Sequence, residues 1–282
     1  MPTMPAYLDW LYDAVCFKAS HNSYQGSNEK PQDPSKWDFG ARYDTGCRGF
    51  ELDLYQCDPM PGGGGCEWSV SHEGESLGNR CWPLGDYLRH MRRWSELHPG
   101  HDPLFVVLDL KSVRGPYAEF AHDLDAYLGQ IMGDRLFTPG HLLRSGDPDL
   151  VRAVRNPEFG WGPLAAMLET FVFCLSGTGK ASRAAYAAFR PHDRLCFTDM
   201  DLPEDVTLTQ ETQAQGHQVV INVPAGQMYW GKNWLKHNPG FLLRVYDLSS
   251  STWKMAVSHG PNILATDDVE LLSVGADAFR PS

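Results

Sequence analysis

Short, mostly apolar runs recur along the chain and are separated by more polar segments. Several of these runs are apolar at nearly every position, as expected for strands that are covered on both faces. We therefore expect buried strands at residues 14–20, 49–55, 104–110, 171–177, 194–200, 218–223, 241–247 and 262–267.

Two segments between these runs have a helical periodicity instead. In residues 83–97, apolar side chains recur at spacings of three and four, at Leu84, Tyr87, Leu88, Met91 and Trp94. Residues 117–131 have the same spacing, at Tyr117, Phe120, Ala121, Leu124, Leu128 and Ile131. Pro83 suits the first helical position. Strands that alternate with helices indicate an α/β fold with a parallel sheet.

The order of the eight runs predicts a (β/α)8 barrel of the TIM type. An additional run at residues 68–72 fits the second arm of a β-hairpin that extends from strand two, with the Gly- and Pro-rich residues 57–66 at its tip. No linker-like segment or internal repeat divides the chain. We therefore expect residues 1–282 to form a single barrel domain.

The charge of the chain limits its partners. A formal net charge of −11 repels the phosphate backbone of nucleic acids, so we expect no nucleic-acid partner. The same charge opposes an anionic membrane unless bound cations or a local aromatic and basic patch offset it. Residues 228–237 contain three aromatic side chains, Tyr229, Trp230 and Trp234. They indicate either a transient contact with a membrane surface or packing against the barrel, and we favour packing.

No apolar run reaches the roughly 18 residues that a membrane-spanning helix needs. The first residues contain no basic region before an apolar stretch, so they do not resemble a signal peptide. The expected location is the cytoplasm if the native chain begins at Met1, and the outside of the cell if a signal peptide was removed. The sequence does not determine the oligomeric state.

The seven cysteines fall into two groups. Three lie in apolar strand-like runs and are expected in the core, namely Cys16, Cys174 and Cys196. Four lie around the Gly- and Pro-rich segment, where they suit one or two disulfides in an exported protein, namely Cys47, Cys57, Cys66 and Cys81. Cys57 and Cys66 face each other across the predicted hairpin. The chain contains no CxxC spacing, so the cysteines do not indicate a zinc site.

Chemically capable residues gather at the ends of three predicted strands. They are His21 and Asn22 after strand one, Glu51 and Asp53 on strand two, and Asp109 and Lys111 at the end of strand three. Active sites of this barrel lie at the carboxyl ends of the strands. Because side chains alternate across a strand, the two members of each i, i+2 pair point the same way. We therefore expect one site at this end of the barrel.

Three converging carboxylates require a cation. Without one, Glu51, Asp53 and Asp109 would repel one another or take up protons. Together with the amide of Asn22 they offer oxygen ligands only, which favours Ca²⁺, with Mg²⁺ as the alternative. A simpler interpretation is an ion-paired barrel rim that involves Arg48.

Two histidines are candidates for proton transfer beside this ion. His21 and His72 can accept or donate protons near neutral pH. A metal ion with an acid/base pair is suited to attack at phosphorus, where charge must be neutralised and a leaving oxygen protonated. Lys111 is a candidate phosphate contact or a partner of Asp109, and Arg244 on strand seven is a second candidate for substrate binding.

Four motifs in this order resemble the catalytic X-region of phosphatidylinositol-specific phospholipases C, most closely the calcium-dependent bacterial group. They are ASHNSY at 19–24, RGFELDLY at 48–55, VSHEG at 70–74 and VVLDLKS at 106–112. The segment WKMAVSHGPNILATDD at 253–268 resembles the closing strand of that superfamily. The resemblance therefore spans nearly the whole predicted barrel.

The resemblance implies a calcium-dependent phosphodiesterase, a phosphoric diester hydrolase or lyase of the phospholipase C type. Its calcium ligands would be Asn22, Glu51, Asp53 and Asp109. His21 would stabilise the reacting phosphate region, and His72 would protonate the leaving alcohol. Attack by a hydroxyl of the substrate headgroup would give a cyclic phosphate. The substrate would be a phospholipid or another phosphodiester.

The sequence also departs from the family pattern. Glu73 separates His72 from Gly74, where the family usually reads HG, and Asp109 stands where animal enzymes use glutamate. These departures make the substrate class less certain than the class of reaction. A glycerophosphodiester phosphodiesterase or a sphingomyelinase D-like enzyme, which also uses two histidines and an ExD pair on the same barrel, is an alternative. A calcium-dependent headgroup-binding module without turnover is an alternative of another class.

Overall fold

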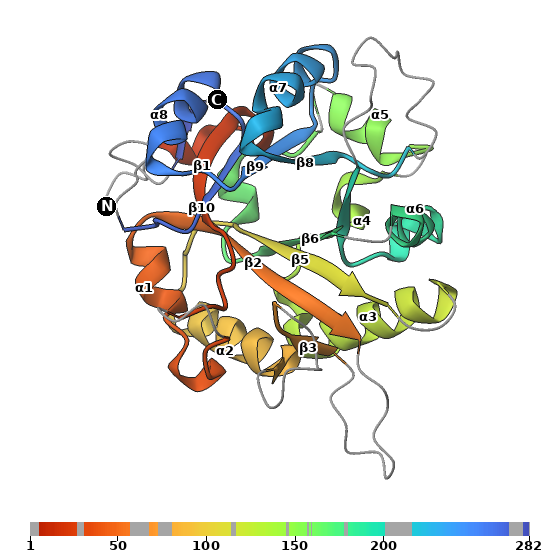
Figure 1. Cartoon of the computed structure of the whole chain (residues 1–282). Helices are drawn as coiled ribbons and strands as arrows, with labels where there is room; N and C mark the ends of the chain where they lie inside the picture. The colour runs from red at the N-terminus through yellow and green to blue at the C-terminus, as the bar shows by residue number, and fades with distance from the viewer. Residues whose placement is uncertain are drawn as a thin grey trace.

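Eight parallel strands form a closed barrel in the computed structural model (Figure 1). The structure describes residues 6–26, 31–56, 68–72, 81–113, 117–144, 147–156, 158, 160–177, 180–200, 216–270 and 279–281, without the side chains of 117–119, 121, 180 and 181. The barrel strands are β1 (Val15–Ser20), β2 (Cys47–Gln56), β5 (Leu104–Ser112), β6 (Phe171–Gly177), β7 (Phe197–Met200), β8 (Val220–Pro224), β9 (Leu242–Tyr246) and β10 (Ile263–Thr266). The ring closes because β1 pairs in parallel with both β2 and β10.

The predicted TIM-type barrel is confirmed, and each of the eight predicted runs overlaps one of its strands. The largest difference in bounds is at β7, which begins at Phe197 although the apolar run begins at residue 194. The backbone N–H of Leu195 donates to the Asp125 carboxylate, and that of Cys196 donates to the Tyr186 hydroxyl. These side-chain acceptors take the place of a neighbouring strand, so the strand starts later.

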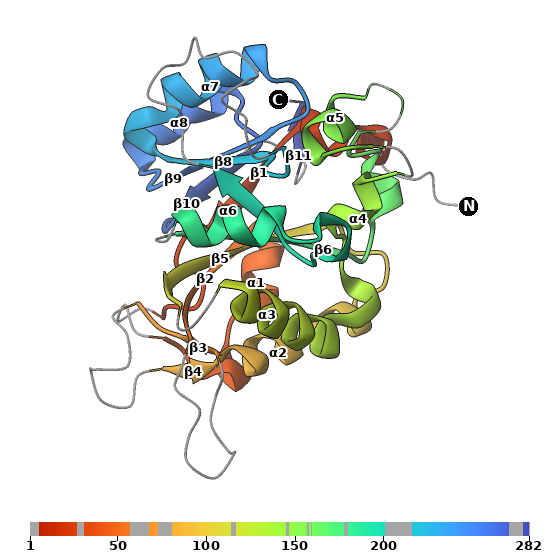
Figure 2. The same cartoon turned by 90° about the vertical axis from the view of Figure 1, so that its right-hand side faces the viewer.

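Helices surround the barrel (Figure 1 and Figure 2). They are α1 (Phe39–Asp44), α2 (Leu84–Leu97), α3 (Tyr117–Met132), α4 (Pro139–Leu142), α5 (Leu150–Arg155), α6 (Lys180–Ala188), α7 (Met228–His237) and α8 (Ser250–His259). The short 3-10 helices are η1 (Ala6–Asp9), η2 (Tyr12–Ala14), η3 (Pro34–Lys36), η5 (Gly133–Arg135), η6 (Leu164–Met167), η7 (Pro191–Asp193) and η9 (Ala225–Gln227). The two helices that the periodicity predicts form as α2 and α3, although Pro83 is the N-cap of α2 and not its first helical residue.

Three short strands extend the sheet beyond the barrel. β3 (Trp68–Val70) pairs antiparallel with β2 and is the predicted second arm of the hairpin. β4 (Trp82–Pro83) pairs with β3, and β11 (Phe279–Pro281) pairs antiparallel with β1. The last two were not predicted from the sequence. The predicted hairpin tip at residues 57–66 lies outside the described residues.

Alternation along β2 and β5 separates the core from the site. The outward side chains pack in one apolar cluster with residues of α2 and α3, and they are Phe50, Leu52, Leu54, Val106, Leu108 and Leu110. The intervening positions on these strands therefore face the barrel interior, and they include Glu51, Asp53 and Asp109. The apolar packing that holds the two strands thus also directs three carboxylates inward.

Gly49 permits the close approach at which the barrel closes. Ala19 on β1 lies opposite Gly49 on β2, and a Cβ on Gly49 would lie 2.5 Å from the Ala19 Cβ. Only glycine fits this contact without a shift of one strand. The turn that follows β1 is therefore held directly beside the inward face of β2.

The positions of the cysteines agree in part with the sequence prediction. Cys16, Cys174 and Cys196 are buried, as predicted, while Cys47 and Cys81 are free thiols. The proposed Cys57–Cys66 disulfide lies outside the described residues and stays a prediction.

In α7, Trp234 is buried, whereas Tyr229 and Trp230 are 66% and 52% exposed. None of the helices in the described ranges is long and apolar enough to cross a membrane.

Candidate metal and catalytic site

The turn after β1 places Asn22 beside β2. The Ser23 N–H donates to the Glu51 carbonyl at 3.1 Å, and the Glu51 N–H donates to the Ser23 hydroxyl at 2.8 Å. Asn22 has φ 44°, in the left-handed region that asparagine tolerates better than most residues. These contacts fix the backbone beside Asn22 next to a strand that carries two of the predicted metal ligands, and the Asn22 amide nitrogen lies 3.3 Å from His21 Nδ1.

Glu51, Asp53 and Asp109 meet inside the barrel, where one oxygen from each lies within 4.8 Å of the others. Asp53 is fully buried, and within the described part of the chain the Oδ1 atoms of Asp53 and Asp109 are buried without a hydrogen-bond partner. Leaving carboxylate oxygens buried and unpaired costs free energy. An oxygen-seeking cation would supply the missing contacts, so the donor set fits Ca²⁺.

Two side-chain cations approach the same carboxylates. Lys111 Nζ lies 2.5 Å from Asp109 Oδ2 and 3.2 Å from Asp53 Oδ2. Arg244 reaches across from β9 and donates to Glu51 Oε2 and, at 2.8 Å, to Asn222 Oδ1. The carboxylates are thus ion-paired, as the simpler interpretation expects, but Arg48 as a partner is wrong, because it binds Asp102 at 2.6 Å.

The electrostatics show which carboxylate most lacks positive charge. Burial, and then the neighbouring charge of Glu51, raise the pKa of Asp53 to about 7, although Lys111 partly offsets this. Burial also acts to raise the pKa of Glu51, but the positive charges of Arg244, His21 and Lys111 together outweigh it and the pKa falls. Burial acts to lower the pKa of Lys111, but Asp53 and Asp109 outweigh it and the pKa rises. A divalent cation would favour the ionised form of Asp53.

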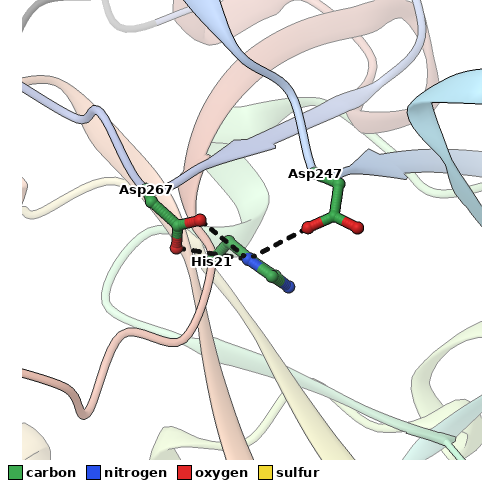
Figure 3. Close-up of side chains that lie close together, drawn as sticks. All are labelled: His21, Asp247 and Asp267. Carbon is green, nitrogen blue, oxygen red and sulfur yellow. Dashed lines mark hydrogen bonds and ion pairs between the residues drawn. The ribbon is translucent and has the colours of Figure 1, made fainter. Parts of the chain in front are cut away.

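His21 lies between two carboxylates (Figure 3). Its Nδ1 is 3.2 Å from Asp267 Oδ1 and 3.7 Å from Asp247 Oδ1, while its Nε2 is 3.9 Å from Glu51 Oε2. Its ring stacks on Tyr246, with centroids 5.9 Å apart. Burial opposes a charge on His21, but the Asp267 hydrogen bond and Glu51 raise its pKa.

His72 lies just beyond the end of β3. The N–H of Ser71, its neighbour, donates to the Asp53 carbonyl at 3.2 Å, and the Tyr55 hydroxyl donates to the His72 carbonyl at 3.2 Å. The backbone of His72 is thereby tied to β2, while the residue is exposed to solvent. The structure therefore places one predicted histidine beside the carboxylates and the other just beyond the outer strand of the hairpin.

Three contacts of the site were missed in the sequence. The Tyr24 hydroxyl donates to Asp53 Oδ2 at 2.9 Å, and Asp247 and Asp267 flank His21. Asp247 directly follows β9, and Asp267 directly follows β10. Both aspartates are the last residues of predicted strands, so the rule that active-site residues lie at the carboxyl ends of the barrel strands applies to them as well.

Comparison with known proteins connects this site to a family. The sequence model of "Phosphoinositide phospholipase C, Ca2+-dependent" matches residues 76–232, which is more than half of the chain. The match includes Asp109 and Lys111, whereas His21, Glu51 and Asp53 precede it. No curated protein matches the sequence.

Solved structures of the same fold include bacterial phospholipases. The calcium-dependent phosphoinositol-specific phospholipase C of a Pseudomonas sp., in a myo-inositol complex, has 21% identity and a TM-score of 0.78, covering 99% of this chain and 98% of that chain. The Ca²⁺-dependent enzyme of Streptomyces antibioticus has 19% identity and a TM-score of 0.71, covering 93% and 96%. A glycerophosphodiester phosphodiesterase of Agrobacterium tumefaciens has 14% identity and a TM-score of 0.54, covering 91% and 97%.

The position of Asp109 depends on Gly177, which provides a first test of the site. Gly177 at the end of β6 has φ 89°, and a Cβ there would lie 1.8 Å from Asp109 Oδ1. We expect Gly177→Ala to displace the Asp109 carboxylate and to weaken Ca²⁺ binding at least about tenfold, because it moves a charged ligand. Isothermal titration calorimetry measures this.

Gly100→Ala is the matched control for that variant. Gly100 has a similar φ of 80°, but a Cβ there would meet nothing within 4 Å. Both variants carry the strain of a side chain at positive φ, and only Gly177→Ala also brings a Cβ against the Asp109 carboxylate and, at 2.6 Å, the Leu110 carbonyl oxygen. Equal Ca²⁺ affinity in the two variants would contradict the role given to Gly177.

Proposed function

The chain belongs to the Ca²⁺-dependent phosphoinositide phospholipase C family, and from this premise we propose that it cleaves a phosphoinositide with Ca²⁺ bound by Asn22, Glu51, Asp53 and Asp109. Proteins of this family are phosphodiesterases. The observation that carries the proposal is the inward cluster of three carboxylates, two of which have buried oxygens without a partner in the described residues.

The positive groups around the cluster would receive the substrate phosphate. Bound Ca²⁺ would neutralise negative charge on the phosphoryl group. Arg244 is almost fully buried and is held in place by Glu51 and Asn222, so its guanidinium presents a fixed charge to the barrel interior. Such preorganised charge stabilises a transition state without reorganisation at the moment of reaction.

His21 is well placed to take a proton from the attacking hydroxyl. If its Nδ1–H donates to Asp267, its Nε2 is left as the acceptor, and this atom lies on the Glu51 side of the ring. The carboxylate also stabilises the imidazolium that forms. This adds a base function to the electrostatic one that the sequence predicts for His21.

His72 would complete the reaction as the general acid. In our proposal a headgroup hydroxyl loses its proton to His21 and forms a bond to phosphorus, while the bond from phosphorus to the lipid alcohol breaks. His72 donates a proton to that departing oxygen. The exposure of His72 supports this role, because the leaving alcohol departs towards solvent or lipid. The product is a cyclic phosphate.

The reaction and its metal dependence can be tested together. We expect the protein to cleave a phosphoinositide when Ca²⁺ is present, to lose turnover in excess chelator and to regain it when Ca²⁺ is added back. Phosphorus NMR identifies the products, and a cyclic inositol phosphate is expected. Glycerol phosphate or a cyclic lipid phosphate would favour the alternative enzymes, and full activity in chelator would contradict the metal site.

A comparison of leaving groups tests the roles of the two histidines. Losing a general acid costs about 10²- to 10⁴-fold in rate, and an acidic leaving group that needs no proton recovers most of this loss. We therefore expect His72→Ala, but not His21→Ala, to recover most of its rate with a nitrophenyl ester. Equal recovery in both variants would show that the roles are wrong.

The contact between His21 and Asp267 makes a separate prediction. Asp267→Asn keeps the shape of the side chain but removes the charge that holds His21 in position. We expect kcat to fall by about 10²-fold or more, since charged partners of catalytic histidines have effects of this order. Asp247→Asn is the control, because Asp247 is farther from Nδ1 at 3.7 Å, and its effect should be smaller. A larger loss of kcat in Asp247→Asn than in Asp267→Asn would show that Asp247 is the charged partner of His21.

The surface of α7 supports a lipid substrate. Exposed Tyr229 and Trp230 lie in its first turn, which follows the carboxyl end of β8, and no acidic residue occurs in residues 216–246. We expect Trp230→Ala to lower turnover of phosphoinositide in vesicles and to leave a water-soluble ester unaffected. Assays with both substrates measure this, and equal losses would exclude a surface role.

A further inference from the structure

One ammonium group bridges two of the proposed calcium ligands. Lys111 Nζ lies 2.5 Å from Asp109 Oδ2 and 3.2 Å from Asp53 Oδ2. The Asp53 side chain is fully buried and that of Asp109 is 15% exposed, so water screens neither contact well. A lysine at this position is a charge partner of the ligands themselves.

This arrangement conflicts with a divalent cation at the same carboxylates. Ca²⁺ takes carboxylate oxygens at about 2.3–2.6 Å. Lys111 contacts the Oδ2 atoms of Asp53 and Asp109, whereas the Oδ1 atoms are the ones without a hydrogen-bond partner in the described residues, so the conflict is one of charge. An ammonium and a Ca²⁺ on the same two carboxylates would be like charges only a few ångströms apart, and their repulsion is strong where water is excluded. Binding of the ion therefore has to overcome the charge of Lys111.

Lys111 is the more exposed of the two cations at the cluster. Arg244 is almost fully buried, and its guanidinium donates to both Glu51 and Asn222. Lys111 has a 27% exposed side chain, and a lysine ammonium is carried on a flexible stem of four carbons. Of the two charge partners of the cluster, Lys111 can therefore turn towards solvent with the smaller rearrangement, since the Arg244 side chain is only 2% exposed.

We propose that Lys111 is a built-in counter-ion that competes with Ca²⁺ for Asp53 and Asp109 and thereby sets the calcium affinity of the site. The inference rests on the proposed function, because it takes Ca²⁺ as the ion that binds there. In the absence of Ca²⁺ the ammonium holds the two carboxylates together. Its charge then weakens Ca²⁺ binding, so that the site responds to a higher range of calcium concentration.

Calcium titration of a neutral variant tests the competition directly. Lys111→Met keeps most of the length of the side chain and removes the charge. We expect it to bind Ca²⁺ at least about tenfold more tightly than the unsubstituted protein in isothermal titration calorimetry, because a competing cation is lost. Lys236→Met is the matched control, since Lys236 is exposed in the last turn of α7, and we expect its Kd within about twofold of the unsubstituted value.

Thermal unfolding provides a second measurement that does not depend on turnover. In chelator, Lys111→Met should unfold at a lower temperature, because the carboxylates lose their charge partner. In saturating Ca²⁺ the difference should close or reverse, since a ligand stabilises the folded state in proportion to RT ln(1 + [L]/Kd). Lys111→Arg keeps the charge, and we expect its calcium affinity to stay close to that of the unsubstituted protein.

The outcomes separate this inference from the proposed function. An unchanged or weaker affinity in Lys111→Met, with Ca²⁺ still bound by the unsubstituted protein, would overturn the role of Lys111 alone. If Lys111→Met does not fold, the test is Lys111→Arg. Calcium binding by Lys111→Arg at least about tenfold tighter than by the unsubstituted protein would overturn the role of Lys111 as well, because this variant keeps the charge. No Ca²⁺ binding by the unsubstituted protein would overturn the proposed metal site itself.

Discussion

The mutual repulsion of three carboxylates inside the barrel is the constraint on which the site depends. Glu51, Asp53 and Asp109 are held together by strands whose outward side chains form the core, so they cannot separate without loss of apolar packing. The charge has to be balanced in place. Lys111 and Arg244 provide two positive charges, and two buried oxygens remain unpaired among the described residues. A hard divalent cation resolves this better than protonation does, because it provides both charge and contacts.

The barrel turns this electrostatic requirement into a reaction centre. Closure between β1 and β2 at Gly49 brings His21 and Asn22 beside the carboxylates, and closure between β1 and β10 brings Asp267 to His21. Both closures are made by backbone pairing between strands, which does not involve the side chains of the site. The same architecture in the bacterial phospholipases, at about 20% identity, shows that the fold tolerates extensive change in sequence.

Much of this arrangement could be predicted because it depends on local rules. Period-two alternation places Glu51 with Asp53 and Asp109 with Lys111 on one face, and strand direction brings the pairs to one end of the barrel. Other contacts join residues that are distant in sequence. Arg244 binds Glu51 across 193 positions, and His21 meets Asp267 across 246. Such pairings depend on the register of strands around the ring, which the pattern along one strand does not contain. For the same reason Arg48 was considered as the partner of Glu51, although its position on β2 directs it to Asp102.

A crystal structure of the protein with Ca²⁺ tests the central claim most directly. We predict one ion between Glu51, Asp53 and Asp109, with the amide oxygen of Asn22 as a further ligand and oxygen distances of about 2.3–2.6 Å. Anomalous scattering distinguishes Ca²⁺ from water at this position. An ion bound elsewhere, with none at these carboxylates at saturating calcium, would contradict the account.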